Sequence, residues 1–538
     1  LQIDVTEAPY GADPSGGVDS TAAIQAAIDD VGQAGGGVVH LPPGTYRVAP
    51  PAGKQQALHI GYSGVVVRGA GPQQTRILNT ATNMRTKRII DVRPDPDVHY
   101  IWYHDAGDSV ALSEDADIGA RSIRLTGLGD YQVGDWVVVR ADASDAFLDE
   151  HGMLGTWNPQ FAGLAFYRQI IAIDAGSKTV ELDVPLRYPV KTRDNARIHR
   201  TKDHLEEVGI EKLSIGNLRN STPGMDTDDY QIPGTGGYQV HASFAIYLTL
   251  VVNGWVDDVH SYEAPGNGGV HILSSGLRLD SSRFVTVRDC DFRHPQYEGA
   301  GGNGYLFVHT GSENLITEST GIDGRHNFTF SLMYSSGNVI HRSRSQDGRL
   351  PADFHQLLSM TNLVDNMAVD NDSLEAIFRD CCGHGHSTTE SVYWNTHGLS
   401  YPWDQFFFKF IIESQQFGHG YVIGTRGPAD KVENPSGDGT APKDWVEGEG
   451  MGDSLEPQSL YDEQLARRLG TYVPPGEGSD GGPGGGGDGG AGGGSDAGTG
   501  GTEGPGPNDG GCSAAGGSAP GWGLMVLAAL ATIRRRRR

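Results

Sequence analysis

The sequence has 538 residues and is strongly acidic, because 41 lysines and arginines face 67 aspartates and glutamates and leave a net charge of −26. This surplus of carboxylates argues against a partner held through its phosphates, so nucleic acid is excluded as a partner. The four cysteines include no C-x-x-C pair and no zinc-finger spacing, which excludes the common structural zinc modules.

A helix followed by a short strand is predicted near the N-terminus. Apolar residues recur at helical spacing over residues 23–31, and Asp19 or Ser20 can cap this helix. Three glycines end it, and residues 38–41 then form a predicted strand before a Pro-Pro-Gly turn. The stretch that starts at Tyr10, YGADPSGGVDSTAAIQAAIDDVGQAGGGVVHLPPGTYRV, resembles the opening motif of the pectate-lyase superfamily, in its rhamnogalacturonase/epimerase-like form.

That resemblance implies a fold and a class of substrate. It implies an all-β chain wound as a single-stranded right-handed parallel β-helix, with a short N-terminal helix that caps the first coil, and it implies a polysaccharide substrate. We therefore expect residues 1–107 to form the N-terminal cap and first coils, and residues 201–475 the main coils and a C-terminal cap. Between them, short alternating apolar runs bounded by Gly and Asp turns predict a small β-rich insertion over residues 108–200. The insertion either walls a substrate cleft or only decorates the coils.

An internal repeat runs through the main coils. Asn314, Asn338 and Asn362 occupy equivalent places in similar segments, with equal spacing because 338 − 314 = 24 and 362 − 338 = 24. Equivalent residues of successive coils stack about 4.8 Å apart, so their side-chain amides can hydrogen-bond from coil to coil. The repeat therefore predicts a structural asparagine ladder.

A second series of similar segments contains an Asp-x-Arg pattern. These segments are Asp291-Phe292-Arg293-His294, Asp323-Gly324-Arg325-His326 and Asp347-Gly348-Arg349-Leu350. Because residues i and i+2 of a strand point to the same face, we expect parallel columns of aspartates and arginines on neighbouring coils. Clustered carboxylates suit Ca²⁺, so the candidate metal ligands are Asp291, Asp323 and Asp347. The alternative is that each Asp simply pairs with the Arg of its own segment.

The arginine column would give this acidic protein the local positive charge that an acidic glycan requires. Removal of the C5 proton of a uronate and elimination of the 4-O-linked sugar need a cation beside the carboxylate and a base near that proton. We expect Arg325 and Arg349 to neutralise the carboxylate and His326 or His355 to take the proton, with Asp353 beside His355. The residues expected to bind the remainder of the substrate are Arg293, His294, Asn327 and Trp403.

One further segment carries a weaker signal. His384 and His386 form a single H-x-H pair, for which the sequence offers no clear third metal ligand. The triplet Gly383-His384-Gly385 also resembles the Gly-His-Gly of polygalacturonase-type hydrolases, but their Asn-Thr-Asp-Gly segment and paired aspartates have no counterpart here.

The composition changes abruptly near the C-terminus. Residues 476–511 are rich in Gly, Ser and Asp and are expected to be a disordered linker. Residues 512–538 place Cys512 ahead of a short apolar segment and five arginines, an order that resembles the myxobacterial carboxy-terminal sorting signals. By that resemblance Cys512 is the processing or lipid-attachment residue, and the protein is secreted or anchored transiently at the cell surface, in the outer membrane. The alternative is a plain low-complexity terminus.

At the other end, the sequence starts at Leu1 without a basic and apolar leader, and we expect any export signal to have been removed or to lie outside it.

Three functions follow from these observations. The leading prediction is a polysaccharide lyase that cleaves an acidic, uronate-containing glycan by β-elimination, with Ca²⁺ as the candidate cofactor. The first alternative is a glycoside hydrolase on the same fold, which would use a pair of carboxylates from among Asp291, Asp323, Asp347, Asp353 and Glu375. The second alternative is a β-helix that binds or adheres to glycans without catalysis.

Overall fold

The computed structural model describes residues 1–95, 102, 103, 105, 107–160, 163–201, 203–403, 409–435 and 442–472. The chain divides into two units, Leu1–Asp462 and Glu463–Arg538. Within the second unit, the described residues complete helix α4 (Leu460–Leu469), in which Arg467 donates to Glu463 at 2.8 Å. None of the described helices is long and apolar enough to cross a membrane. The predicted linker 476–511, the tail 512–538 and Cys512 lie outside the described residues.

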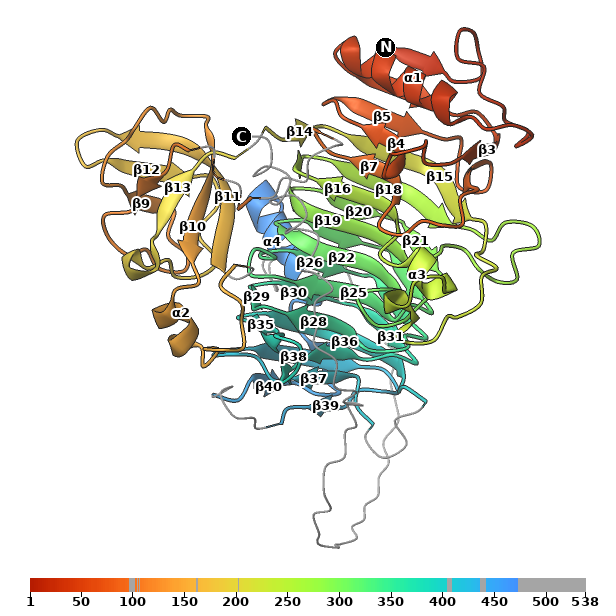
Figure 1. Ribbon diagram of the computed structural model, residues 1–538. Coiled ribbons are helices and arrows are strands. Elements are labelled where there is room, and N and C mark those ends of the chain that lie inside the picture. The colour runs from red at the N-terminus through yellow and green to blue at the C-terminus, as the bar shows by residue number, and fades with distance from the viewer. Residues whose placement is uncertain are drawn as a thin grey trace, which may run out of the picture. The chain divides into compact units, whose positions relative to one another are not determined.

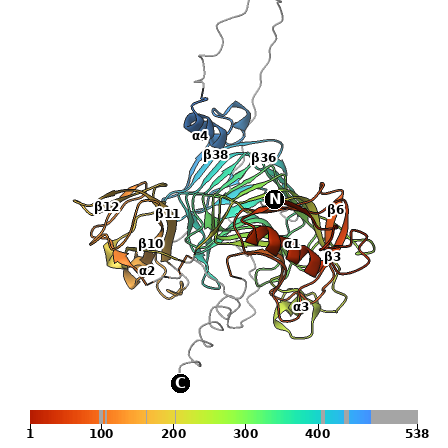
Figure 2. The ribbon, with the colours of Figure 1, turned by 90° about the horizontal axis from the view of Figure 1, so that it is seen from above.

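Helix α1 (Thr21–Gln33) covers the N-terminal end of the coils (Figures 1 and 2). Its apolar face is fully buried, since Ile24, Ile28 and Val31 are each 0% exposed. The side-chain amide of Gln25 donates to the carbonyl oxygen of His59 and accepts from its N–H, both at 2.8 Å. His59 belongs to strand β4 (Gln56–Ile60), the first strand of one of the long sheets. The helix therefore satisfies backbone groups of a strand that would otherwise be an open edge. The predicted capping helix is confirmed.

After α1 the chain winds into a parallel β-helix, as predicted, whose coils stack along two long sheets (Figure 1). The described strands of the larger sheet, called sheet A, are β1 (Gln2–Asp4), β2 (Gly37–His40), β3 (Gly44–Val48), β5 (Val65–Arg68), β6 (Thr75–Asn79), β15 (Gly209–Asn217), β18 (Trp255–Ser261), β20 (Thr286–Arg288), β21 (Asp291–Arg293), β23 (Leu315–Thr317), β24 (Thr320–Ile322), β26 (Val339–His341), β27 (Arg344–Gln346), β30 (Leu363–Asp365), β31 (Ala368–Asp370), β36 (Val392–Ser400), β38 (Tyr421–Arg426) and β40 (Trp445–Glu447).

The second sheet, called sheet B, carries the candidate site. Its main described strands are β4 (Gln56–Ile60), β7 (Arg88–Val92), β16 (Phe244–Thr249), β19 (Ser275–Arg283), β22 (Tyr305–Ser312), β25 (His326–Ser331), β28 (Ala352–Gln356), β32 (Leu374–Ala376), β37 (Ile412–Ser414) and β39 (Val432–Glu433), with β14 (Leu205–Glu206) and β17 (Val251–Val252) at its side. Smaller described elements between the coils are the pairs β29 (Ser359–Met360) with β35 (Thr388–Thr389) and β33 (Phe378–Arg379) with β34 (Gly385–His386), helix α3 (Gly236–Val240), and the 3₁₀ turns Asp229–Gln231 and Gly452–Ser454.

Like side chains stack inside the coils because the parallel strands pair in register. Phe307 stacks on Phe328 with ring centroids 4.8 Å apart, and Phe330 stacks on Phe354 at 4.7 Å. These distances match the spacing of about 4.8 Å between paired strands. The core is therefore a set of side-chain columns that run from coil to coil.

The predicted asparagine ladder is confirmed. The side-chain oxygen of Asn338 accepts from the backbone N–H of Asn314 at 3.0 Å and from its side-chain amide at 3.2 Å. Asn362 accepts from Asn338 in the same way, at 3.0 Å for both bonds. Each asparagine thus ties its own turn to the next coil, and all three are buried.

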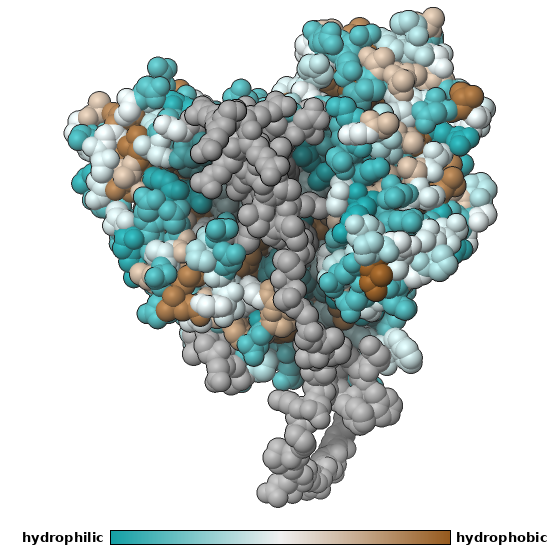
Figure 3. Space-filling view, in the orientation of Figure 1, coloured by the Kyte–Doolittle hydropathy of each residue, from teal (hydrophilic) through white to brown (hydrophobic). Residues whose placement is uncertain are grey.

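The predicted β insertion is an antiparallel sheet with its own core, drawn beside the coils in Figures 1 and 2. Its described elements are β8 (Val110–Ala111), β9 (Ser122–Arg124), β10 (Trp136–Asp142), α2 (Asp145–Glu150), β11 (Gly163–Asp174), β12 (Thr179–Leu182), a 3₁₀ turn at Thr192–Asp194, and β13 (Arg197–His199). Its core continues onto Met333, Leu358 and Met360 of the coils. On the face shown in Figure 3, hydrophilic side chains predominate over the coils and the insertion alike, in keeping with the charge of the chain.

Candidate functional site

Sheet B carries one continuous column of outward side chains. Phe330 and Phe354 belong to the core, so the alternating residues before them, Thr329 and Asp353, point outward. In order along the sheet, the paired residues of this column are His59, Asp91, Tyr247, Arg278, Val308, Thr329, Asp353, Glu375, Glu413 and Glu433. The column therefore ends in consecutive carboxylates that begin at Asp353.

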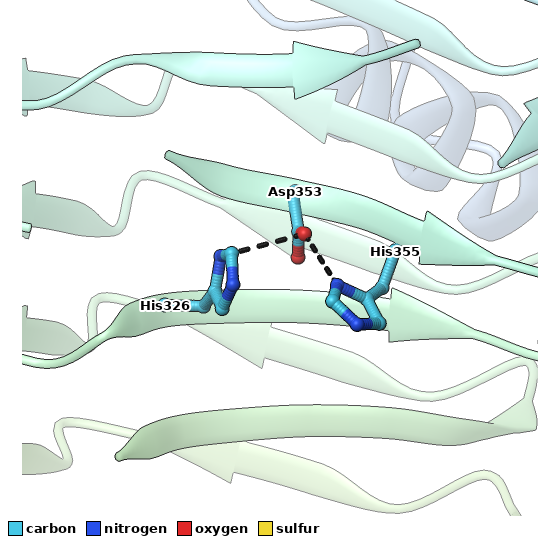
Figure 4. Close-up of side chains that lie close together, drawn as sticks. All are labelled: His326, Asp353 and His355. Carbon is cyan, nitrogen blue, oxygen red and sulfur yellow. Dashed lines mark hydrogen bonds and ion pairs between the residues drawn. The ribbon is translucent and has the colours of Figure 1, made fainter. Parts of the chain in front are cut away.

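His326, Asp353 and His355 meet on the adjacent strands β25 and β28, and we call them the His-Asp-His cluster (Figure 4). Nδ1 of His355 lies 2.7 Å from Oδ2 of Asp353, and Nδ1 of His326 lies 3.4 Å from the same oxygen. The Asp353 side chain is 0% exposed, that of His326 2% and that of His355 14%. Three of the predicted catalytic residues are thus in contact, and His355 is the one that solvent reaches.

Arg379, which the sequence analysis did not single out, adds a cation to this cluster. Its Nη2 donates to Oδ2 of Asp353 at 2.9 Å, its Nη1 lies 2.9 Å from Nδ1 of His355, and it pairs with Glu375. It comes from β33, one strand of an antiparallel hairpin that interrupts the coil. This hairpin lies outside the 24-residue repeat, so the repeat could not point to Arg379. The sequence hinted at this arginine only by placing it four residues after Glu375, with which it pairs.

Two further rings surround the cluster. The hydroxyl of Tyr305 lies 3.2 Å from Nε2 of His355, and its ring meets that of His326 edge to face at 4.8 Å. His384, from the turn of the β33–β34 hairpin, has its ring centroid 4.8 Å from that of His355. Nδ1 of His384 is buried and has no hydrogen-bond partner among the described residues. The weak H-x-H signal was therefore informative for His384, whereas His386 is bound to the backbone oxygen of His151 at 3.0 Å in the insertion.

Burial keeps the imidazoles of the cluster neutral. It lowers the pKa of His326 and of His355 to about 4. Burial alone would raise the pKa of Asp353, but His326, His355 and Arg379 together lower it far below its ordinary value. At neutral pH the cluster therefore consists of neutral rings around an ionised carboxylate that is paired with Arg379. Nδ1 of His326 lies 2.6 Å from the carbonyl oxygen of Pro351, which can only accept, so this nitrogen carries the hydrogen and Nε2 holds the lone pair.

The predicted pair Arg325 and Arg349 lies at the edge of sheet B, just before β25 and β28. Both donate through Nη1 to the backbone oxygen of Glu298, at 3.3 Å and 2.8 Å respectively. Arg325 is half-buried and Arg349 is exposed. Burial, with help from Asp323, raises the pKa of the Glu298 carboxyl to about 7, although Arg349 and Arg325 oppose this shift. Arg325 and Arg349 therefore meet at the backbone oxygen of Glu298, and Arg325 directly precedes His326.

The expected alignment of Asp291 and Arg293 with the other two segments is wrong. Strand β21 pairs with β24 so that Asp291 lies beside Thr320 and Arg293 beside Ile322. The structural offset is therefore 320 − 291 = 29 residues, whereas the sequence match had an offset of 32, which is three residues out of register. Arg293 pairs with Asp291 of its own strand at 2.6 Å, as the structural alternative predicted.

The predicted Ca²⁺ site at Asp291, Asp323 and Asp347 is not formed. Asp323 binds Nδ1 of His294 at 3.0 Å, and Asp347 accepts from Asn371 at 2.8 Å. Among the described residues, the His-Asp-His cluster is the one group of three or more His, Cys, Asp or Glu residues whose ligand atoms all lie within 4.8 Å of one another. With two nitrogen ligands and one carboxylate already paired with a cation, it fits Ca²⁺ poorly, because that ion prefers several oxygens.

The remaining predicted substrate-binding residues are bonded to other residues of the coils. Asn327 is 0% exposed, and its amide donates to Ser345 and to the backbone oxygen of Gln346 inside the coils, so it cannot reach a substrate. Trp403 is 84% exposed, and its N–H donates to Asn371 at 2.8 Å. His294 is partly exposed and turned toward Asp323, so it and Trp403 stay predictions.

A concave site of about 360 Å³ lies elsewhere, over sheet A, where Arg76, His260 and Tyr262 contribute to its walls. The pKa of the Tyr262 hydroxyl is raised by burial, and Arg76 lies over the Tyr262 ring at 5.7 Å. None of the predicted site residues lines this cavity. The convergence of ionisable groups at the His-Asp-His cluster makes the cluster the stronger candidate for chemistry.

Residues 3–103 match the family described as rhamnogalacturonase A/epimerase, pectate lyase-like. These residues hold the capping helix and the first coils of the parallel β-helix described above. The N-terminal part of the chain is therefore similar to that family. The fold of the chain is also that of the tailspike gp61 of Pseudomonas phage phi297, with a TM-score of 0.50 at 12% identity over 84% of this chain and 75% of the tailspike.

Short segments of the chain are also similar to proteins named as an alginate lyase and a mannuronan C5-epimerase. The chain is 46% identical to alginate lyase 7 of Azotobacter vinelandii over 68 residues, which are 13% of this chain and 8% of the relative. It is 43% identical to mannuronan C5-epimerase AlgE3 of the same organism over 75 residues, or 14% of this chain and 4% of the relative. The matched segments thus span less than a tenth of either relative, so the activity of this chain is argued from its own residues.

Proposed function

We propose that the protein is an extracellular or cell-surface enzyme that cleaves a uronate-containing polysaccharide by β-elimination at the His-Asp-His cluster. The observation that carries the proposal is the contact of two neutral imidazoles with an ionised, buried aspartate, next to three arginines at the surface of sheet B. A neutral imidazole can accept a proton, and arginines can stabilise the charge that then develops on a uronate. The names of the relatives support the same class of substrate.

In this proposal the residues divide the reaction between them. Arg325 and Arg349 hold the carboxylate of the uronate and stabilise the enolate-like intermediate. His355, which Asp353 orients and which solvent reaches, takes the C5 proton. The bond from C4 to its glycosidic oxygen then breaks with the electron pair on that oxygen. The Tyr305 hydroxyl, whose pKa burial raises so that it stays protonated, supplies the proton to this leaving oxygen. No step requires a metal ion.

The test is the product formed from defined polysaccharides. Purified protein is incubated with alginate, with polygalacturonate and with a neutral glucan as control. A lyase releases chains that end in an unsaturated uronate, which absorbs near-ultraviolet light, from the acidic substrates alone. Exchange of solvent deuterium into C5 without cleavage would instead show an epimerase, and binding without any product would show a glycan-binding protein; either result contradicts the proposal.

A hydrolase is the second candidate, and one observation favours it. Glu375 and Glu413 are paired on neighbouring coils beside Asp353, and burial together with Glu375 and Glu433 raises the pKa of Glu413 to about 7. Glycoside hydrolysis needs one protonated and one ionised carboxyl side by side. Here Glu413 would be the protonated one, and Glu375, which pairs with Arg379, the ionised one. Reducing ends that appear without near-ultraviolet absorbance, and that Glu413→Gln abolishes, would identify this activity.

The proposed location rests on the C-terminal tail. If Cys512 is the processing or lipid-attachment residue, Cys512→Ala leaves the protein unprocessed and retained in the membrane. The intact mass of the protein and its surface display report this directly, with Ser513→Ala as the control. Unchanged mass and display in Cys512→Ala would remove the sorting signal from the proposal.

A further inference from the structure

We propose that the His-Asp-His cluster, together with His384, binds a divalent first-row transition ion such as Zn²⁺, in competition with the guanidinium of Arg379. This ion differs from the Ca²⁺ predicted from the sequence, and its site lies on different residues. A bound ion would also block the cluster, so the proposal adds an inhibitor to the proposed function. Binding itself is measured without substrate and is independent of that function.

The donor set selects the class of ion. Two imidazoles and one carboxylate offer ligand atoms that all lie within 4.8 Å of one another (Figure 4). Imidazole nitrogen together with a single carboxylate suits zinc and similar transition ions better than calcium or magnesium. Ligand atoms of a tetrahedral zinc site lie about 3.3 Å apart, since each bond is about 2.0 Å long. The 3.4 Å between Nδ1 of His326 and Asp353 already has this value, and coordination there would replace the bond to Pro351.

His384 stands beside the three ligands and would have to turn toward them to supply a fourth. Its ring stands 4.8 Å from that of His355, and its Nδ1 is buried without a hydrogen-bond partner among the described residues. A buried, unbonded ring nitrogen costs free energy, and coordination to an ion would remove that cost. The backbone oxygen of His384 accepts from Trp157 of the insertion at 2.8 Å, which holds the turn against the site.

Arg379 stands where the ion would bind. One guanidinium nitrogen donates to the Asp353 carboxylate, and the other faces Nδ1 of His355, each at 2.9 Å. Oδ2 of Asp353 and Nδ1 of His355 are two of the ligand atoms that the ion needs. The guanidinium is a permanent cation, so a metal ion must displace it and overcome its charge. This competition makes a prediction that ordinary surface binding of zinc does not make: removing Arg379 should strengthen metal binding.

The test is calorimetric titration of the tag-free full chain with Zn²⁺, with Co²⁺ as a spectroscopic probe of tetrahedral coordination. The exposed thiols of Cys381 and Cys382 lie in the same hairpin, so every protein carries Cys381→Ser and Cys382→Ser. We expect one ion per chain. Arg379→Gln should tighten binding about tenfold or more. His384→Ala should weaken it by at least about tenfold, which is the smallest loss seen even for residues that only support a metal ligand. Arg379→Met is the second variant if Arg379→Gln does not fold.

His40→Ala is the matched control, because His40 also lies near a carboxylate, 3.8 Å from Asp4, but far from this cluster in the sequence and on sheet A. Its Zn²⁺ affinity should equal that of the parent. The proposal is overturned if neither the parent nor the Arg379 variants bind an ion, or if His355→Ala and His40→Ala bind it as the parent does. A loss of polysaccharide cleavage in any variant has no bearing on this result.

Discussion

At the scale of single residues, charge and protonation decide what the cluster can do. Arg325 directly precedes His326 and lies half-buried at the edge of sheet B, where it is held by the backbone oxygen of Glu298. A cation held in this way can act on a substrate carboxylate without a large loss of side-chain entropy, because its position is already fixed. Its planar guanidinium can also make two parallel hydrogen bonds to a carboxylate.

Replacement of Arg325 tests this role. If it stabilises charge that grows in the transition state, Arg325→Ala should lower turnover by about two to three orders of magnitude while the thermal transition stays near that of the parent. Arg325→Lys should restore only part of the loss, because an ammonium cannot make the planar two-pronged contact. Arg288→Ala, which removes an exposed arginine paired with Asp257 on sheet A, is the control. Lost stability with normal turnover per folded molecule would show that Arg325 is structural.

At the scale of elements, the columns that join the coils hold the fold together. Asn338 accepts from Asn314 and donates to the backbone oxygen of Gly311, all within the buried interior. Asn338→Ala leaves the buried N–H of Asn314 unpaired, so we expect a loss of about 2–4 kcal/mol in the free energy of unfolding. Chemical denaturation measures this loss. The exposed Asn83→Ala should change stability by less than about 0.5 kcal/mol.

The aromatic column contains one residue that weakens it. His309 stacks on Phe330 at 4.8 Å, is fully buried, and has no partner for either ring nitrogen among the described residues. Burial lowers its pKa from 6.5 to about 3. Between these two values the unfolded chain binds a proton that the folded chain does not, so stability falls as the pH drops from about 6.5 toward 3.

His309→Phe should therefore stabilise the protein by about 1–3 kcal/mol and reduce its sensitivity to acid. Thermal unfolding of the parent and the variant between pH 4 and pH 7 reports both effects, and the difference between them should be largest at low pH. A variant that is less stable than the parent at every pH would show that the ring nitrogens are satisfied or that the larger ring does not fit.

At the scale of the first unit, one buried ion network joins the insertion to the coils. Glu313 receives two hydrogen bonds from Arg168 of the insertion, at 3.0 and 3.1 Å, and lies 3.3 Å from Arg187. The side chain of Arg168 is 0% exposed and that of Glu313 6%. Such a pair contributes little over an apolar contact, but removal of one partner leaves an uncompensated buried charge.

Glu313→Gln should therefore destabilise the junction by about 3–5 kcal/mol and free the insertion before the coils unfold. Limited proteolysis should then cut near the ends of the insertion, around residues 105 and 203, while the coil fragments stay intact. Glu318→Gln is a close control, because Glu318 has the same positive φ of 51° as Glu313 but is exposed. Equal cleavage patterns for the two variants would contradict the role of the network.

The sequence by itself determined the features that repeat or that depend on neighbours in the chain. The capping helix followed from apolar spacing over residues 23–31, and the ladder followed from the equal spacing of Asn314, Asn338 and Asn362. Strictly periodic coils place residues 24 apart on top of one another, so the pairing of Thr329 with Asp353 could be counted. The sequence named His326, Asp353 and His355 as candidates, but their mutual contact came from the structure.

Only the tertiary structure decided what lies where the period changes. The loop before β22 makes this coil longer than 24 residues. Asp291 and Arg293 are therefore out of register with the later Asp-x-Arg segments, although the sequences are similar. Asn327 follows His326 on the same strand, so alternation already implies that the two side chains point to opposite faces. The structure shows that Asn327 is the one that turns into the coils. Arg379 and His384 reach the cluster from a hairpin outside the repeat. Contacts between the repeating coils and segments outside the repeat depend on loop length and packing. Neither of these produces a periodic pattern of residues in the sequence.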